Sequence, residues 1–252
     1  MKYFSKTAYL PWLTLFAGGV GLILRFWLFS TGVDSSGLLV EGHPADLLIW
    51  LLAAMVIAGL WFATGSLVAA PKYAFNYPPS LSAAIGCGFA ALGIVITSVR
   101  SLTAPEDTLT YVAAIMGIAA AAALVFLAVL RFRGLQPNIL LHVIPCVFFM
   151  LRLISLYRHW STNPQLQNYS FQLLGTVFLM LSAYYRAAFD VDMGRRRPLV
   201  LCHLITVFFC CLSITDLDAA IFYLPTGIWL FTDLCSLEPQ KLQPQEDDHD
   251  PS

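Results

Sequence analysis

Four arginines are the first residues in this sequence that could do chemistry. Arg25 and Arg152 lie inside long apolar segments, and Arg100 and Arg158 lie at or just beyond the outer ends of such segments. Arginine presents a planar fork of N–H donors that binds phosphate and carboxylate groups in a bidentate way. One interpretation is therefore an outward-facing anion-binding site for a small anion or an anionic lipid head group. We prefer the structural interpretation, in which these side chains reach the membrane interface unaided or pair with nearby acids.

Two histidines and two cysteines form a second candidate set. His142 and Cys146 are one helical turn apart, and Cys202 and His203 are neighbours in a later apolar segment at a similar depth. These side chains could complete a zinc site or supply axial ligands to a haem. The spacing matches no metal-binding motif, so we expect no cofactor and expect each histidine to be satisfied by a neighbouring helix. The metal site stays open as the alternative.

Two short acidic patterns and one basic run complete the candidate residues. The acidic patterns are Asp190 with Asp192 and Asp216 with Asp218. Such pairs can hold a divalent metal, but the pattern is short, and charge balance is the simpler interpretation. The basic run is expected to balance the first pair and to contact anionic lipids. It consists of Arg195, Arg196 and Arg197.

The composition identifies the environment in which these residues work. Of the 252 residues, 58% are hydrophobic and 12% are charged, and the mean hydropathy is +0.73. Soluble domains carry roughly 25% charged residues, so an ordinary soluble protein is excluded. The formal charge of -1 leaves no basic surface for nucleic acid. The sequence carries no nucleotide-binding or hydrolase motif, and we expect a protein without catalytic activity.

Apolar runs of about 20 residues predict helices that cross a membrane. Together they predict an all-α, polytopic bundle in residues 1–234, followed by a disordered acidic cytoplasmic tail in residues 235–252. The last two runs are shorter, which leaves a re-entrant hairpin as an alternative. We prefer two spans, because Asp216 and Asp218 would need partners at a buried hairpin tip. The eight expected spans are approximately 9–30, 45–69, 80–102, 109–130, 138–157, 169–188, 199–214 and 219–234.

The distribution of basic residues predicts the orientation. Lysine and arginine are retained on the cytoplasmic side of a membrane. With the N-terminus inside, the outer segments hold only Arg100 and Arg158. The inner segments hold Lys2, Lys6, Lys72, Arg131, Arg133, Arg186, Arg195, Arg196, Arg197 and Lys241. Both termini are therefore predicted to be cytoplasmic, in the cytoplasmic membrane of a prokaryote.

Small residues predict where helices approach closely in lipid. Gly86 and Gly93 give the third segment a small-residue surface, and Gly117 does the same for the fourth. We expect these two segments to form a tight hairpin.

Two functions follow from these observations. The first is a non-catalytic sensor, or a subunit of a membrane assembly with a protein partner, because the loops are short and no complete catalytic site is present. The alternative is a permease or binding protein that takes an anion through the arginines.

Overall fold

The computed structural model describes residues 9–32, 42–67, 72–103, 107–161 and 169–238. This part of the chain is helical and contains no strand, which confirms the all-α class. The predicted tail lies almost entirely outside the described residues. The elements are α1 (Leu10–Thr31), α2 (Pro44–Ala63), η2 (Thr64–Ser66), α3 (Tyr73–Asn76), α4 (Leu81–Thr103), α5 (Thr108–Arg133), α6 (Leu140–Trp160), α7 (Ser170–Asp190), α8 (Arg196–Leu212) and α9 (Leu217–Cys235).

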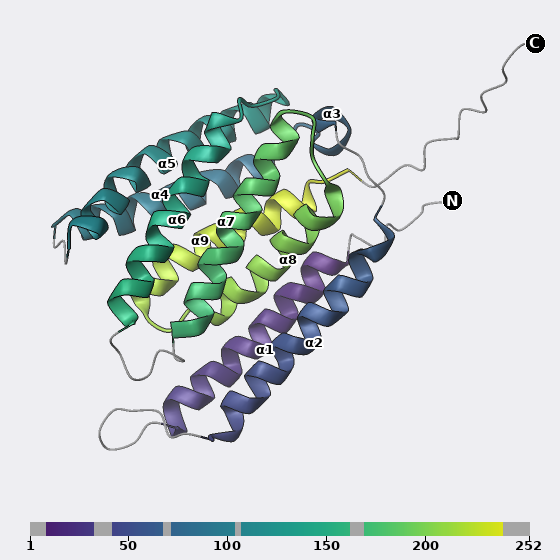
Figure 1. Cartoon of the computed structure of the whole chain (residues 1–252). Helices are drawn as coiled ribbons and strands as arrows, with labels where there is room; N and C mark the ends of the chain where they lie inside the picture. Colours follow the sequence, from purple (N-terminus) through teal and green to yellow (C-terminus); the bar gives the residue numbers. More distant parts are fainter. Residues whose placement is uncertain (1–8, 33–41, 68–71, 104–106, 162–168, 239–252) are drawn as a thin grey trace, which may run out of the picture.

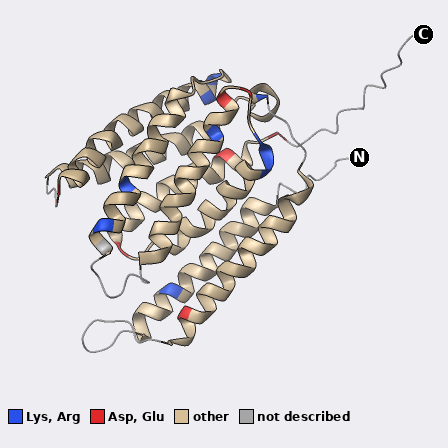
Figure 2. Cartoon of the chain, viewed as in Figure 1, with Lys and Arg blue, Asp and Glu red and all other residues tan. Residues whose placement is uncertain are grey.

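Five helices are long and apolar enough to cross a membrane: α1, α2 continued by η2, α4, α5 and α6. Large apolar side chains cover their outer surfaces, as Phe16, Phe62 and Phe126 illustrate. The charged residues gather mainly near the two ends of the helices (Figure 2). Soluble proteins rarely expose so much apolar surface to water, so these features indicate a membrane protein.

Six helices close into a ring. From each helix to its neighbour, the ring runs α4, α5, α6, α7, α8 and α9, and α9 packs against α4. The α1–α2 hairpin packs outside the ring on α8, at the opposite edge of the molecule from α4 and α5 (Figure 1). Among the described residues, most of the buried polar side chains belong to α7, α8 and α9.

Local sequence explains where the ring helices begin and end. The Asp107 side chain accepts a hydrogen bond from the Thr110 backbone N–H at 2.7 Å and caps the start of α5. Gly134 ends α5 in the left-handed conformation (φ 69°), which glycine adopts without a steric cost. The Asp216 side chain caps α9 by accepting from the Ala219 N–H, also at 2.7 Å. Both acidic caps lie at the same end of the ring.

The glycines of α4 contact a different helix from the one expected. α4 and α5 do form the predicted hairpin, and Gly117 of α5 packs against Ser98 of α4. Gly86 instead faces Thr232 of α9, and a Cβ at Gly93 would lie 2.6 Å from the Ile221 carbonyl oxygen of the same helix. The sequence shows that a helix has a small-residue surface, but it does not show which partner will use that surface.

Candidate functional site

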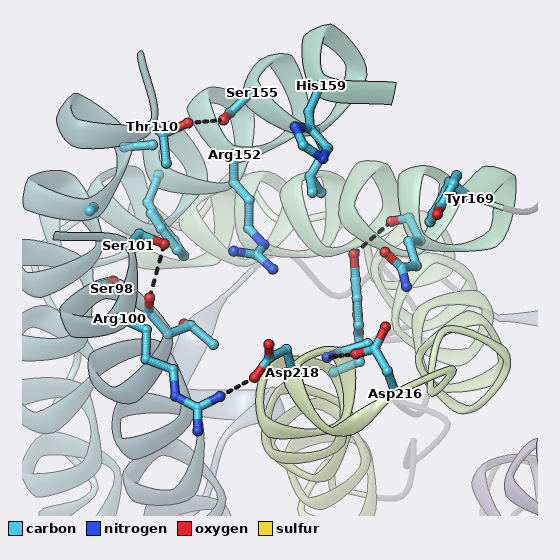
Figure 3. Close-up of a pocket in the computed structure, with 18 residues that line it drawn as sticks. Ser98, Arg100, Ser101, Thr110, Arg152, Ser155, His159, Tyr169, Asp216 and Asp218 are labelled. Atoms are coloured by element: carbon cyan, nitrogen blue, oxygen red, sulfur yellow. Dashed lines mark hydrogen bonds and ion pairs between the residues drawn. The ribbon is translucent and has the colours of Figure 1, made fainter. Parts of the chain in front are cut away.

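A polar pocket opens at the end of the ring that carries the two acidic caps (Figure 3). Its volume is about 330 Å³. The ends of α4, α5, α6, α7 and α9 form its walls, together with short flanking segments. Its polar lining residues are Thr97, Ser98, Arg100, Ser101, Thr110, Arg152, Ser155, His159, Tyr169, Gln172, Asp216, Asp218 and Tyr223.

Arg152 reaches into this pocket from α6 (Figure 3). Its guanidinium carbon lies 3.7 Å from the centre of the Phe222 ring, which supports one face of the group. The Nε atom is buried and makes no hydrogen bond. In the part of the chain that the structure describes, no carboxylate forms an ion pair with Arg152. The guanidinium is therefore available to a negatively charged group in the pocket.

Acidic residues from α9 and its N-cap form the opposite side of the pocket. Arg100, at the end of α4, forms an ion pair with Asp218. Asp216, the N-cap of α9, accepts from the Thr215 hydroxyl through its second carboxylate oxygen at 3.2 Å. Both acids are exposed, and they face Arg152 across the cavity (Figure 3).

The Tyr223 side chain crosses from α9 to α7 and is fully buried. Its hydroxyl donates to the Gln172 carbonyl oxygen at 2.9 Å and lies 2.9 Å from the Thr176 hydroxyl. The Gln172 side-chain amide donates to the Thr215 hydroxyl at 2.9 Å. These bonds connect α7 to α9 and to its N-terminal flank, so the pocket wall below Arg152 is held in place.

Several pocket residues were missed by the sequence reasoning. Ser155 and His159 follow Arg152 by three and seven residues on the same helix, which places all three on one face. Ser155 also lies 3.0 Å from the Thr110 hydroxyl of α5. That spacing was available in the sequence as a signal. The contributions of Gln172 and Tyr223 depend on how the helices pack.

The four arginines do not form one cluster. Arg100 and Arg152 share the pocket, whereas Arg158 lies outside it and pairs with Asp107 at 3.6 Å. The Thr110 N–H bond lowers the pKa of the Asp107 carboxyl below its ordinary value. Arg25 is buried in α1, where its guanidinium lies 4.9 Å from the centre of the Phe171 ring. Of the four arginines considered for an anion site, only Arg100 and Arg152 therefore line the pocket.

A buried network of charged residues lies near the other end of the ring. Asp233 of α9 is its centre: one carboxylate oxygen lies 3.3 Å from an Nη atom of Arg131, and the other lies 3.4 Å from Nε of Arg186. His203 of α8 lies 3.5 Å from the second oxygen. Arg186 also stacks on the Tyr77 ring, 3.4 Å from its centre. From the sequence, Arg131 and Arg186 are expected in loops, where they would set the orientation, but both are buried inside the bundle.

The network extends through Asp190 to α6. One Asp190 carboxylate oxygen lies 2.6 Å from Nδ1 of His142, and the other lies 3.8 Å from Arg186. Asp190 therefore pairs with His142 and Arg186 inside the bundle, and not with the basic run at 195–197 as expected. Cys146 contacts the Met180 carbonyl oxygen at 3.6 Å.

The two histidines pair with different acids. Within the described residues, no three His, Cys, Asp or Glu side chains form a group that could hold a metal. The proposed set of His142, Cys146, Cys202 and His203 gains no support from this arrangement.

The basic run at the start of α8 is divided between the interior and the surface. Arg196 is buried, and its Nη1 donates to the Asn76 side-chain oxygen at 3.1 Å. Arg197 lies over the Trp61 ring at 4.8 Å. Arg195 is exposed, so of the three it is best placed for the expected contact with anionic lipids.

These features define a helical membrane protein with a polar pocket at one end of a six-helix ring and a buried charged network near the other. Comparison with known protein families, with characterised proteins and with solved structures finds no match to this chain.

Proposed function

We propose that this protein is an integral membrane protein that binds a ligand carrying a phosphate or carboxylate group in the Arg152 pocket. The observation that carries the proposal is the Arg152 guanidinium, which enters a polar cavity without a carboxylate partner among the described residues. A cation without a carboxylate partner in such a site costs free energy, and a bound oxyanion lowers that cost. The ligand is a free solute or a lipid head group, because both present the same chemistry.

We further propose that all eight long helices cross the membrane. α7, α8 and α9 are consecutive neighbours in the same ring as α4, α5 and α6, so we place them in the same membrane layer. At about 1.5 Å per residue, the 21 residues of α7 give a length of about 30 Å. Arg186, Asp190, Arg196 and Asp233 are buried, and the exposed Asp218 lies at the first turn of α9, at the pocket end. An even number of spans returns both termini to one side.

The proposed orientation places the Arg152 pocket on the outer face. Arg131, Arg186 and Arg196 are buried and no longer count as loop charges. The remaining inner residues, Lys2, Lys6, Lys72, Arg133, Arg195, Arg197 and Lys241, still outnumber the outer Arg100 and Arg158. The positive-inside tendency then keeps both termini cytoplasmic. We propose the cytoplasmic membrane of a prokaryote as the location, for the same reason.

A binding role fits either a sensor or a permease. Both need a ligand site that is open at one face of the bundle, and the pocket supplies one. No observation favours a subunit role over these two.

The test is ligand binding by the purified protein in an uncharged detergent such as dodecyl maltoside. Isothermal titration with glycerophosphoglycerol and with inorganic phosphate measures free oxyanions. Native mass spectrometry from nanodiscs that contain phosphatidylglycerol and phosphatidylcholine measures retained lipid. We expect Arg152→Ala to weaken binding at least tenfold, because a charge-assisted bidentate contact is lost.

Arg158→Ala is the matched control, since this arginine lies at the same end but outside the pocket. Arg152→Lys should retain part of the affinity, because it keeps the charge without the fork. Equal binding by wild type and Arg152→Ala would refute the proposal.

A further inference from the structure

The charges that line the Arg152 pocket define the ligand more closely than an anion alone, an inference that rests on the proposed binding function. Arg100 and Arg152 bring two positive charges, and Asp216 and Asp218 bring two negative charges. A bare anion would leave the filled pocket with a net negative charge. A ligand with no net charge would leave it balanced.

The opposite charges also lie on opposite sides of the cavity. Arg152 comes from α6 and approaches from one side, while Asp216 and Asp218 stand at the start of α9 on the other (Figure 3). A ligand between them meets a guanidinium at one end and carboxylates at the other. Electrostatic complementarity then selects a molecule whose own charges are separated in the opposite sense.

The two acids differ in how freely they can act. Asp218 already pairs with Arg100, so its charge is largely compensated inside the protein. Asp216 accepts only from the Ala219 N–H and the Thr215 hydroxyl, and no cation pairs with it in the described part of the chain. The charge of Asp216 is therefore not compensated by a cation among the described residues, so this carboxylate can pair with a cationic group of a ligand.

We infer that the pocket takes a zwitterionic ligand, whose phosphate or carboxylate binds Arg152 while its ammonium group binds Asp216 at the acidic side. Phosphoethanolamine-type head groups and amino acids belong to this chemical class. The volume of about 330 Å³ accommodates a polar molecule of that size. The Ser155 hydroxyl along the wall supplies a further hydrogen bond for its polar atoms.

The experiment compares glycerophosphoethanolamine with glycerophosphoglycerol by isothermal titration. Both carry the same phosphodiester, and they differ in an ammonium group against a neutral glycerol. We expect the zwitterion to bind about three- to fivefold more tightly at low ionic strength, the range of an exposed ion pair.

Two variants separate the roles of the acids. Asp216→Asn keeps the helix cap, because asparagine caps as well as aspartate, and it should remove the preference for the zwitterion. Asp218→Asn releases Arg100, so it should strengthen binding of glycerophosphoglycerol and thereby narrow the preference. Asp107→Asn is the matched control: it changes another acidic cap at the same end, outside the pocket, and should keep the wild-type ratio.

The outcomes distinguish this inference from the proposed function. If both compounds bind equally, or if Asp216→Asn keeps the wild-type ratio, the zwitterion is wrong while an anion site stands. If Arg152→Ala binds both compounds as wild type does, the proposed function itself fails. Retention of phosphatidylethanolamine over phosphatidylglycerol in nanodiscs, lost in Arg152→Ala, identifies the source as lipid. Binding of the soluble compound without lipid retention identifies a free solute.

Discussion

Replacing Asp233 by asparagine tests whether the buried network holds the ring together. Asparagine has nearly the same shape, so the change removes charge without leaving a cavity. In the wild type the carboxylate stands between the guanidinium groups of Arg131 and Arg186, at 3.3 and 3.4 Å. The side chains of all three residues are 5% exposed or less. Asp233→Asn therefore leaves two buried cations with far too little compensating charge.

The expected loss follows from the penalty for an uncompensated buried charge. Removing one partner of a buried ion pair costs about 3 to 5 kcal/mol in soluble proteins. Asp190 offsets part of this loss, because it still lies 3.8 Å from Arg186, so we expect a decrease of about 3 kcal/mol in the free energy of unfolding. Unfolding by sodium dodecyl sulfate in mixed micelles, followed by tryptophan fluorescence, measures it. Asp218→Asn is the control, because its ion pair with Arg100 is exposed.

A second substitution makes the interpretation specific. If the loss of stability comes from uncompensated buried cations, adding Arg131→Met to Asp233→Asn should recover part of it. The double variant no longer carries one of the two arginines that lost their carboxylate partner. Arg131→Met alone should destabilise the protein, because Asp233 loses one of its two arginines. Additive losses in the double variant, or a loss from Asp233→Asn no larger than that from Asp218→Asn, would refute the reasoning.

Three further predictions concern packing, orientation and pH. Gly86→Val should lower the free energy of unfolding by about 1 to 3 kcal/mol, because its side chain meets Thr232, whereas Gly88→Val has open space; thermal unfolding of both variants checks this. The exposed Cys235 should react with a membrane-impermeant maleimide only after the cells are permeabilised, and labelling in intact cells would reverse the orientation. Because the pKa of Asp107 is lowered in the fold, its stabilising effect should be complete above the ordinary aspartate pKa and decline as the pH falls below about 4. Asp107→Asn should remove that acid dependence, as unfolding measured across this pH range in both proteins would show.

The helices themselves were predictable from the sequence because apolar runs of this length have few other uses. Structured helices occupy every expected segment, with ends within several residues of the predicted ones. Arg152 was also predictable as a candidate, since a charged residue inside an apolar run stands out in one dimension. Its partners were not, because they come from four other helices, and only packing brings Gln172 or Tyr223 beside it.

The buried network escaped the sequence reasoning for a different reason. Arg131 and Arg186 lie near the ends of apolar runs, where basic residues usually face water or lipid head groups. Asp233 lies at the end of the last run and drew no attention. A count of charges near helix ends cannot separate side chains that face solvent from side chains that face a neighbouring helix. The helical spacing of Gln172, Thr176, Arg186 and Asp190 on α7 was the signal that could have shown an inward polar face.

That inward face also distinguishes α7, α8 and α9 from the five helices that are long and apolar enough to cross a membrane. In a closed ring, each helix can turn its polar side chains to the interior and its apolar side chains to lipid. α7, α8 and α9 follow this division: Thr176, His203 and Asp233 are all buried, and all face other helices. Mean hydropathy averages over both faces, so inward polar side chains lower the mean hydropathy of a helix, and α8, with 17 residues, is also shorter than the five. The helices with the weakest membrane signal are therefore the ones that supply most of the polar chemistry inside the ring.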